Sequence, residues 1–355
     1  MAKTKVITLH PEYPDLKQIA YCAKAIRQGG LVLFPTETVY GIAADFSNPR
    51  AMKRLREVKQ RAEDKPFSIL ISQKGLIKNY TSSAGIQLYK LISSFWPGPL
   101  TVVVPGLIEG QTIGIRMPNN VIALRLVMES QRTIAAPSAN FEGQPPPKRC
   151  RDALAVLDGL VDIAIDGGHT QIGTGSTVVD LTGDSLKMLR QGSITQDQIN
   201  QVANRKTILF VCTGNSCRSV MAEYYLRGCL AEKQNVEVVS AGTGVFLQST
   251  ASHETISVLA EEGIDATEHY SQPVSSILLK KSDLIFVMTR SHRQQVLERA
   301  PEVEKRVYLL KEFTDLPIDA EVNLDVPDPI GQSHAEYKEC LSLIKMAIHK
   351  IEKLV

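Results

Sequence analysis

The sequence predicts a two-part α/β protein, with a large, mixed, twisted sheet in the N-terminal part and a doubly wound parallel sheet in the C-terminal part. Stretches with helical spacing of apolar residues alternate with short apolar runs, which is the pattern of α/β domains. A length of 355 residues is enough for two domains of ordinary size. Residues 192–206 (GSITQDQINQVANRK) are polar with few apolar side chains. We therefore expect domains at residues 1–204 and 205–355.

The predicted N-terminal elements alternate along the chain. Apolar residues from Leu16 to Ile26 recur at helical spacing, and Gly29-Gly30 provides a stop for that helix. Further helices are expected near residues 51–59, 84–95, 120–129 and 149–158. Strands are expected at residues 31–34, 68–71, 100–104, 114–117, 133–136, 161–165, 176–181 and 186–189.

The predicted C-terminal elements begin with a strand at residues 207–211, which leads into a glycine-containing turn and a helix. Alternation of strands with helices favours a doubly wound, parallel sheet. The other strands are expected at residues 236–240, 284–288 and 307–309, and the helices near residues 218–232, 251–262, 291–299 and 334–353.

The composition, 43% hydrophobic and 22% charged, is typical of globular proteins. No run approaches the roughly 20 apolar residues of a membrane helix, and the first residues contain no apolar signal segment. Six cysteines over this length do not indicate a disulfide framework. We therefore expect a cytoplasmic protein that makes no contact with a membrane.

The charge is unevenly distributed. Residues 1–204 contain 23 basic and 17 acidic residues, for a net charge of +6, and residues 205–355 contain 17 and 21, for −4. A moderately basic first half suits an anionic ligand such as a nucleotide. The excess is too small to indicate nucleic-acid binding by itself.

The C-terminal part carries a candidate phosphate-binding loop, Cys212-Thr-Gly-Asn-Ser-Cys-Arg218-Ser219, between a strand and a helix. Backbone N–H groups of such a loop and the helix N-terminus can cradle a phosphate. This environment favours the thiolate form of Cys212, which can attack a bound phosphoryl group and form a phosphocysteine. Arg218 would hold two phosphoryl oxygens in a bidentate contact.

A later Asp-Pro loop, within residues 326–331, supplies a candidate general acid. Asp328 could protonate the leaving group. The catalytic set predicted for this part is therefore Cys212, Arg218 and Asp328. The alternative interpretation is a structural cysteine buried in a glycine-tolerant turn.

Residues 206–355 resemble the low-molecular-weight protein-tyrosine phosphatases, a family that includes protein-arginine phosphatases. The resemblance rests on VCTGNSCRS, on Ser240-Ala-Gly242, on AEEGID, on Met288 with nearby His292, and on the Asp-Pro pair. It implies the roles given above, with Asn215 and Ser219 organising the loop and Ser219 donating a hydrogen bond to the sulfur. The phosphate loop would comprise Thr213, Gly214, Asn215, Ser216, Cys217 and Ser219. Cys217 is either a redox partner of Cys212 or a small residue at the helix start.

Two positions bear on the phosphatase substrate, which we expect to be a phosphoprotein. Phosphotyrosine-directed relatives usually carry a bulky aliphatic residue where this chain has Ser216, and aromatic residues where it has Ile330 and Gly331. Both differences favour phosphoarginine, and phosphotyrosine remains the alternative.

In the N-terminal part, polar residues gather at the ends of predicted strands, which indicates one ligand cleft. The motif PTETVYG follows the strand at 31–34, and Lys59-Gln-Arg61 with Lys65-Pro66 could converge on a polyphosphate. Further strand-end residues are Arg116, Ser138, Asn140, Ser176 and Arg190.

Residues 8–195 resemble the YrdC family of threonylcarbamoyl-AMP synthases. The resemblance rests, in order, on PTETVYG, the Lys-x-Arg turn, WPGPLT, IRMP, APSAN and GSTVVD. It implies condensation of L-threonine, bicarbonate and ATP to threonylcarbamoyl-AMP with release of pyrophosphate. The product would serve the modification of an adenosine beside the anticodon of tRNA, together with partner proteins of that pathway. Two departures, Ala62 and Gln191, remove no ligand side chain.

The same resemblance implies a set of ligand residues. Thr38, Arg116 and Ser176 would hold threonine, with Arg116 pairing its carboxylate. We expect Mg²⁺ to accompany ATP without a dedicated metal site in the protein, and catalysis to rest on positioning and cationic stabilisation. The residues around ATP would be Lys59, Arg61, Lys65, Ser138, Asn140 and Arg190.

Two rival hypotheses remain open. The N-terminal part could be an RNA-binding or regulatory module without synthase activity, although a pure binder would have less need of both the Lys59/Arg61 pair and Ser138-Ala-Asn140. The C-terminal part could be a phosphopeptide sensor, against which the presence of both Cys212 and Asp328 argues.

Overall fold

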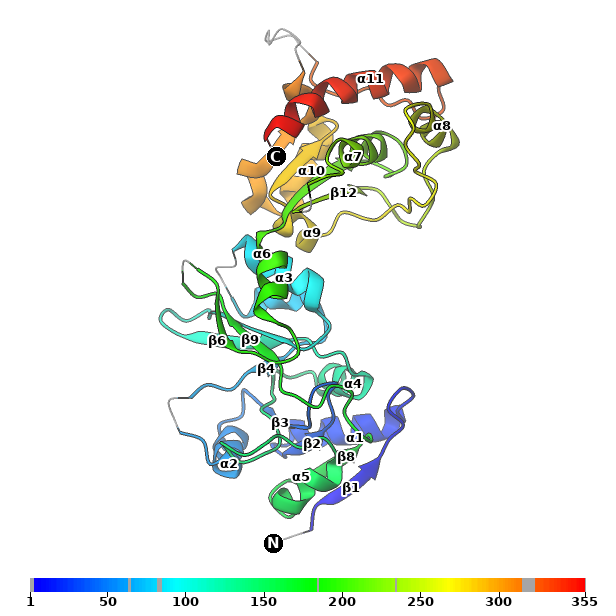
Figure 1. Cartoon of the computed structure of the whole chain (residues 1–355). Helices are drawn as coiled ribbons and strands as arrows, with labels where there is room; N and C mark the ends of the chain where they lie inside the picture. The colour runs from blue at the N-terminus through cyan, green and yellow to red at the C-terminus, as the bar shows by residue number, and fades with distance from the viewer. Residues whose placement is uncertain are drawn as a thin grey trace. The chain divides into compact units, whose positions relative to one another are not determined.

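The computed structural model describes residues 3–62, 65–81, 85–183, 185–233, 235–314 and 323–354. The chain forms two compact units, Met1–Val202 and Ala203–Val355 (Figure 1).

The first unit is built on one mixed sheet of ten strands, as predicted, in the order β1-β8-β2-β3-β7-β4-β6-β5-β9-β10. Parallel pairs such as β1 with β8 and β5 with β9 occur beside antiparallel pairs such as β2 with β3 and β5 with β6. The strands are β1 (Lys5–Thr8), β2 (Val32–Phe34), β3 (Gly41–Asp45), β4 (Ile69–Leu70), β5 (Leu100–Pro105), β6 (Thr112–Arg116), β7 (Ile134–Ala135), β8 (Ile163–Asp166), β9 (Thr177–Asp180) and β10 (Lys187–Arg190).

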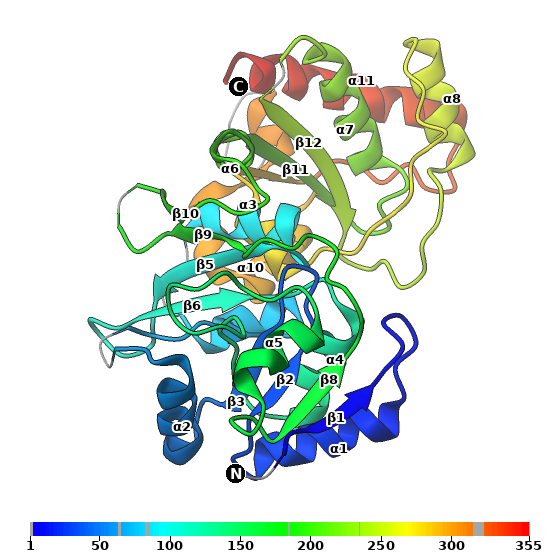
Figure 2. The same ribbon diagram turned by 60° about the horizontal axis from the view of Figure 1, so that its bottom comes forward.

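Helices cover both faces of the half of this sheet that runs, in spatial order, from β1 to β4 (Figure 2). Side chains alternate along a strand, so Val32 and Phe34 pack under α1 and α4, whereas Leu33 packs under α2 and α5. The helices are α1 (Leu16–Arg27), α2 (Pro49–Lys59), α3 (Ile86–Phe95), α4 (Val121–Ser130) and α5 (Cys150–Leu157), with the 3-10 helix η1 (Lys74–Asn79).

The second unit contains a four-stranded, entirely parallel sheet in the order β12-β11-β13-β14, which confirms the predicted doubly wound fold. Helices α7, α8 and α11 pack on one face, and α9 and α10 on the other (Figure 1). The elements are β11 (Lys206–Cys212), α7 (Arg218–Cys229), β12 (Val236–Gly242), α8 (His253–Glu261), α9 (Ser276–Lys281), β13 (Leu284–Val287), α10 (Arg290–Arg299), η2 (Pro301–Arg306), β14 (Val307–Leu309), η3 (Leu310–Phe313), α11 (His334–Ile351) and η4 (Glu352–Leu354).

The strand order places a topological switch point at the carboxyl end of β11. The chain runs from β11 to β12 on one side and later returns to β13 on the other. Ligands of open α/β sheets bind where connections diverge in this way. The candidate phosphate loop, residues 212–218, lies at that point.

The polar stretch predicted to separate the domains is not a simple linker, because residues Gln196–Asn204 form helix α6. Its first turn is closed by a capping box: Gln198 N donates to Thr195 Oγ1 (3.3 Å), and Thr195 N donates to Gln198 Oε1 (2.9 Å). Ile199 and Ala203 are the buried apolar residues of α6, so two such residues are enough to hold this helix against the protein.

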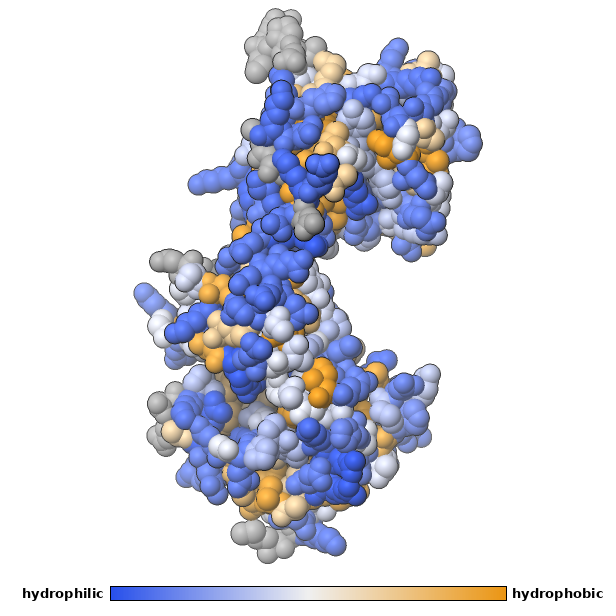
Figure 3. Space-filling model, viewed as in Figure 1, coloured by the Kyte–Doolittle hydropathy of each residue, from blue (hydrophilic) through white to orange (hydrophobic). Residues whose placement is uncertain are grey.

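The visible surface in Figure 3 is mainly hydrophilic, with small separate apolar areas. None of the helices in the described ranges combines the length and the apolarity needed to cross a lipid bilayer.

Candidate active sites

The sulfur of Cys212 sits at the end of β11, directly before the turn into α7. Ser219 Oγ lies 2.9 Å from it, and Asn215 N donates to it at 3.3 Å. Ser219 Oγ itself accepts a hydrogen bond from Asn215 Nδ2 (3.0 Å), so its own proton is available for the sulfur. The sulfur therefore faces two donors, and this arrangement stabilises a negative charge on it.

Asn215 holds the loop in shape from inside. Its backbone is left-handed, with φ of 54°, a conformation that asparagine tolerates better than most residues. The fully buried side chain donates to Ser240 Oγ at 2.7 Å and accepts from Gln272 N at 2.9 Å. These ties fix the direction of the Asn215 N–H that points at the sulfur.

Gly242, at the end of β12, lies directly beneath this loop. A Cβ atom there would stand 2.4 Å from Thr213 O and 3.0 Å from Asn215 N. The next residues complete the contact, because Thr243 N donates to Cys212 O and Gly244 N donates to Thr213 O. The Ser240-Ala-Gly242 motif therefore has a steric role that its sequence alone does not reveal.

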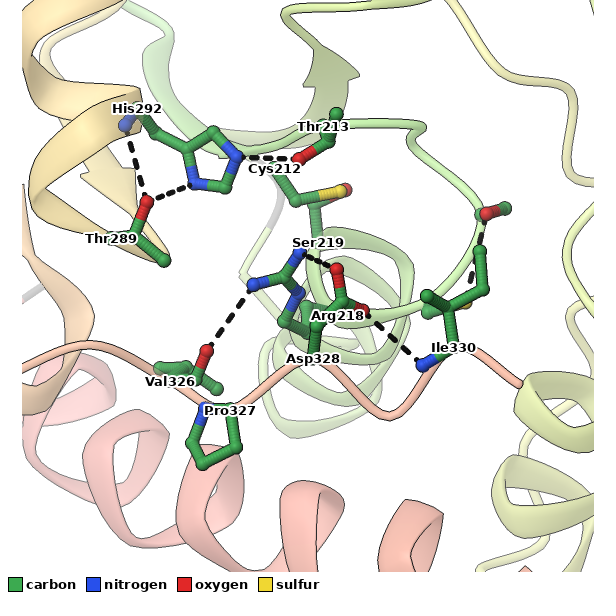
Figure 4. A network of polar contacts seen from close by, with 12 residues as sticks. Cys212, Thr213, Arg218, Ser219, Thr289, His292, Val326, Pro327, Asp328 and Ile330 are labelled. Carbon is green, nitrogen blue, oxygen red and sulfur yellow. Dashed lines mark hydrogen bonds and ion pairs between the residues drawn. The ribbon is translucent and has the colours of Figure 1, made fainter. Parts of the chain in front are cut away.

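Arg218 and Asp328, predicted to act together, are in direct contact (Figure 4). Arg218 Nη2 forms an ion pair with Asp328 Oδ2, and Nη1 donates to Val326 O at 3.2 Å. Arg218 Nε is buried and has no hydrogen-bond partner in the described part of the chain. Asp328 is partly exposed, and its other carboxylate oxygen accepts from Ile330 N (3.3 Å).

Neither Ser216 nor Cys217 forms a hydrogen bond with the Cys212 sulfur in the described part of the chain. Ser216 O accepts from Ser252 N, and Cys217 Sγ lies 3.4 Å from Tyr337 Oη. All six cysteines are free thiols. The redox role of Cys217 stays a prediction.

Sequence reasoning missed a buried carboxylate behind the loop. Glu223 on α7 accepts a hydrogen bond from Ser240 Oγ and pairs with Arg227 Nη2 at 2.5 Å. Burial raises its pKa despite the charge of Arg227. The spacing of Glu223 and Arg227, one helical turn apart, was the available signal.

All nine ligand residues predicted for the first unit line one cavity of about 560 Å³. They reach it from different elements, most of them at strand or helix ends. The nine are Thr38, Lys59, Arg61, Lys65, Arg116, Ser138, Asn140, Ser176 and Arg190.

Lys59, the last residue of α2, is held by uncharged oxygens. Its Nζ donates to Ser138 O at 2.6 Å, to Asn140 O, and to Asn140 Oδ1 at 3.3 Å. These acceptors use all three donors of the ammonium group. Burial, and then the charge of Arg61, lower the pKa of Lys59 to about 8. In this conformation Lys59 contributes charge to the cavity and fixes the Ser138-Ala-Asn140 turn.

Arg61 and Lys65 line the cavity from the segment that follows α2. Arg61 stacks over the ring of Phe67 at 5.1 Å and donates to Pro66 O at 2.9 Å. Lys65 forms an ion pair with Glu142, whose pKa is lowered chiefly by that hydrogen bond. Glu142, which also lines the cavity, was not among the predicted residues.

Arg116 is anchored by a second residue that was missed. Its Nη2 forms an ion pair with Glu37 Oε1 at 2.8 Å, and its Nε donates to Gly98 O at 3.2 Å. Both partners are almost fully buried. The Glu of PTETVYG and the WPGPL corner therefore position the arginine assigned to the threonine carboxylate.

Arg190 and Ser176, which also line the cavity, are tied together. Arg190 Nε and Nη2 both donate to Ser176 O, at 3.0 and 2.8 Å. Ser176 Oγ lies 2.8 Å from Thr101 Oγ1. Loss of surrounding water, followed by the charges of Arg116 and Arg61, lowers the pKa of the Arg190 guanidinium. The Arg190 guanidinium is thus close enough to Arg116 and to Arg61 to be repelled by both.

Thr38, which is assigned to bind the substrate threonine, is also held by a hydrogen bond within the protein. Its Oγ1 lies 2.8 Å from Thr36 Oγ1. Within the described residues, no group of three or more His, Cys, Asp or Glu side chains is arranged to hold a metal ion.

Comparison with known proteins assigns each unit. A family model for Sua5/YciO/YrdC, described as telomere recombination, matches residues 24–192, and one for low molecular weight phosphotyrosine protein phosphatase matches residues 207–355. The chain belongs to both families, one in each unit. The YrdC/Sua5 part is 39% identical over 194 residues to the threonylcarbamoyl-AMP synthase of Bacillus subtilis, an alignment that covers 52% of this chain.

The chain spans only 56% of the length of that Bacillus synthase. A crystal structure of Pyrococcus abyssi Sua5 complexed with L-threonine matches with a TM-score of 0.54 and 25% identity, covering 86% of this chain and 99% of that one. In the phosphatase part, a Ralstonia nicotianae protein named "Probable low molecular weight protein-tyrosine-phosphatase EpsP" is 34% identical over 143 residues, which are 40% of this chain and 91% of that protein.

The lowered pKa of Lys59 predicts a pH dependence of anion binding in the YrdC/Sua5 cavity. Lys59 is charged below its folded pKa of about 8 and neutral above it. The affinity for ATP, measured by equilibrium titration without threonine, should therefore be constant near pH 7. It should fall above pH 8 by up to about tenfold for each pH unit.

Lys59→Arg, which keeps its charge throughout this range, is the matched control and should bind ATP without that decline. An affinity of the natural protein that stays level from pH 7 to 9.5 would contradict the assigned role of the Lys59 charge.

Proposed function

We propose that the first unit makes L-threonylcarbamoyl-AMP from L-threonine, bicarbonate and ATP, with release of pyrophosphate. The observation that carries this proposal is the gathering of all nine predicted ligand residues around one cavity. Membership in the synthase family and the likeness to a Sua5 protein crystallised with L-threonine support it. The product would pass to the proteins that place threonylcarbamoyl groups on adenosine in tRNA.

The chemistry asks the protein chiefly to position its substrates. Arg116, Thr38 and Ser176 would hold threonine, whose amine takes up bicarbonate carbon to form a carbamate and water. The carbamate oxygen then attacks the α-phosphorus of ATP, and pyrophosphate leaves. Lys59, Arg61, Lys65 and Arg190 would stabilise the phosphate charge. Mg²⁺ would enter with ATP and neutralise part of that charge, with few protein ligands of its own.

We further propose that the second unit hydrolyses a phosphorylated protein through a phosphocysteine on Cys212. The thiolate attacks phosphorus while Asp328 gives its proton to the leaving group. The resulting Asp328 carboxylate then takes a proton from water, which attacks the phosphocysteine and releases phosphate. The observation that carries this is the sulfur of Cys212, which accepts from the Asn215 N–H and faces the Ser219 hydroxyl in the loop that ends at Arg218.

The contact between Arg218 and Asp328 fits this sequence of events. A bound phosphoryl group carries two negative charges and would compete with Asp328 for the guanidinium. Release from Arg218 would free Asp328 to carry the proton that the leaving group needs. Among phosphoproteins, the small hydroxyl of Ser216 and the aliphatic, exposed Ile330 favour phosphoarginine over phosphotyrosine.

The synthase proposal predicts that purified protein releases pyrophosphate only when ATP, threonine and bicarbonate are all present. Lys59→Ala should lower kcat/KM for ATP by about 10- to 100-fold, because it removes a charge and three hydrogen bonds. A coupled pyrophosphate assay measures both the dependence on each substrate and the kcat/KM of the Lys59→Ala variant. Release that does not depend on threonine would contradict the synthase and leave a regulatory or RNA-binding module as the better account.

The phosphatase proposal predicts that Cys212→Ser lowers hydrolysis of an aryl phosphate about a thousandfold or more. The same variant should retain threonine-dependent pyrophosphate release, which serves as the internal control for folding. Phosphoarginine and phosphotyrosine peptides assayed side by side should favour phosphoarginine. Hydrolysis that survives Cys212→Ser would refute the assignment of the nucleophile, and a preference for phosphotyrosine would refute the assignment of the substrate.

A further inference from the structure

A buried histidine contacts the phosphate loop of the second unit without a role in the steps above. His292, in the first turn of α10, is only 4% exposed. Its Nε2 lies 2.9 Å from the hydroxyl of Thr213, the residue that follows Cys212. Its Nδ1 lies 2.9 Å from the hydroxyl of Thr289. Figure 4 shows the imidazole between these two threonines, with one nitrogen directed at each.

The proton count at Thr289 assigns the tautomer of His292. Thr289 is the N-cap of α10, and its Oγ1 accepts a hydrogen bond from His292 N at 3.2 Å. Among the described residues, His292 Nδ1 is the only acceptor within hydrogen-bond distance of the Thr289 hydroxyl, and we infer that the hydroxyl proton is donated to it. With Nδ1 accepting, the proton of a neutral imidazole is on Nε2. The Nε2–H group therefore donates to Thr213 Oγ1.

The imidazole remains neutral under ordinary conditions. Burial, and then the positive charge of Arg218, lower the pKa of His292 to about 4; the carboxylates of Asp328 and Asp325 act in the opposite direction. A neutral ring has one donor and one acceptor, so the chain of hydrogen bonds runs in one direction, from Thr289 through His292 to Thr213.

The Thr213 hydroxyl is left with a proton to give. It accepts from His292, and no other hydrogen bond of this hydroxyl occurs among the described residues. Thr213 is exposed, and its backbone oxygen is tied to Gly244 N at 3.0 Å. His292 approaches this oxygen from the buried side and Thr213 itself is exposed, so the proton is left for an acceptor on the exposed side of the loop.

We propose that His292 is a positioning residue that orients the Thr213 hydroxyl to donate a hydrogen bond to an oxygen of the bound phosphoryl group. This inference rests on the proposed phosphatase function. It adds a neutral, side-chain donor to the backbone N–H groups and Arg218. Such a contact exists both in the bound substrate and in the transition state, so its loss should raise KM and leave kcat nearly unchanged.

The test is a double-mutant cycle with p-nitrophenyl phosphate as substrate. Thr213→Val removes the hydroxyl with little change in shape, and His292→Phe keeps a ring of similar size without the N–H donor. Each single change should raise KM about fivefold to tenfold, as expected for one hydrogen bond. The double variant should be no worse than either single one, because the second change removes a contact already lost.

A rescue variant separates orientation from packing. His292→Gln carries an amide N–H group at a reach similar to that of imidazole Nε2, so it should recover most of the affinity. A merely structural role would make the two effects additive, lower kcat, and leave His292→Gln as impaired as His292→Phe. Any of these three results would overturn the proposal.

Two measurements do not depend on turnover, and they distinguish a failure of this inference from a failure of the phosphatase proposal. The dissociation constant for inorganic phosphate should rise by the same fivefold to tenfold in each single variant and no further in the double. Nitrogen NMR of the ¹⁵N-histidine-labelled full chain should show the Nε2-protonated, neutral form of His292 down to about pH 5. An Nδ1-protonated ring, or phosphate affinity unchanged in His292→Phe, would refute the inference even if hydrolysis is absent.

Discussion

Cations held by backbone oxygens are the constraint on which both candidate sites depend. Lys59 is anchored by Ser138 O and Asn140 O, Arg190 by Ser176 O, and Arg218 by Val326 O. A carbonyl oxygen fixes the direction of a cationic side chain, but it brings no full negative charge to cancel it. Such anchoring leaves positive potential in the cavity for a ligand to satisfy, which a carboxylate partner would consume.

The exceptions to this pattern agree with the assigned roles. Arg116 has a buried carboxylate partner in Glu37, and it is the cation assigned to a singly charged amino-acid carboxylate rather than to phosphates. Lys65 pairs with Glu142 at a more exposed position. Asp328 pairs with Arg218, but Asp328 is itself assigned to carry a proton during the reaction. The Glu37 carboxylate therefore reduces the local charge at Arg116, where less of it is needed. At Lys65 and Arg218, a bound phosphate would compete with the carboxylate for the cation.

The sequence was most informative where the chemistry demands particular residue types at particular strand ends. The loop from Cys212 to Ser219 and the nine residues of the first cavity could be named because each belongs to a short motif that the family resemblances cover. Most of these motifs lie at strand ends, and Lys59, Arg61 and Lys65 lie at the end of a helix. The residues that hold these ligand and catalytic side chains in place could not be predicted in the same way. Glu37 and Glu142 are carboxylates whose partners come from elements far away in the chain, and only the fold reveals those contacts. For Glu223, the fold reveals the contact with Ser240 on the next strand, whereas its pairing with Arg227 is local to α7.

The missed elements have local explanations. Strand β3 (Gly41–Asp45) is buried along its whole length, so it lacks the alternation that marks a strand with one exposed face. Strand β1 (Lys5–Thr8) is mostly exposed and therefore has little apolar signal. Helix α6 was not predicted because its stretch is polar and contributes only two buried apolar residues, Ile199 and Ala203, although the Thr195–Gln198 capping box was present. Patterns of apolar residues do not reveal an element that is almost wholly buried or almost wholly exposed. For a helix of that kind, such as α6, the capping residues are the remaining sequence signal.

The central claim is that the cations of the first cavity keep their charge available to a ligand, and the salt dependence of ATP binding tests it most directly. Arg190→Gln keeps an N–H donor for Ser176 O but removes the charge. We predict that the affinity of the natural chain for ATP falls steadily as salt is raised, and that Arg190→Gln binds more weakly with a smaller dependence on salt. An Arg190→Gln variant with the natural affinity and the natural salt dependence would contradict the account.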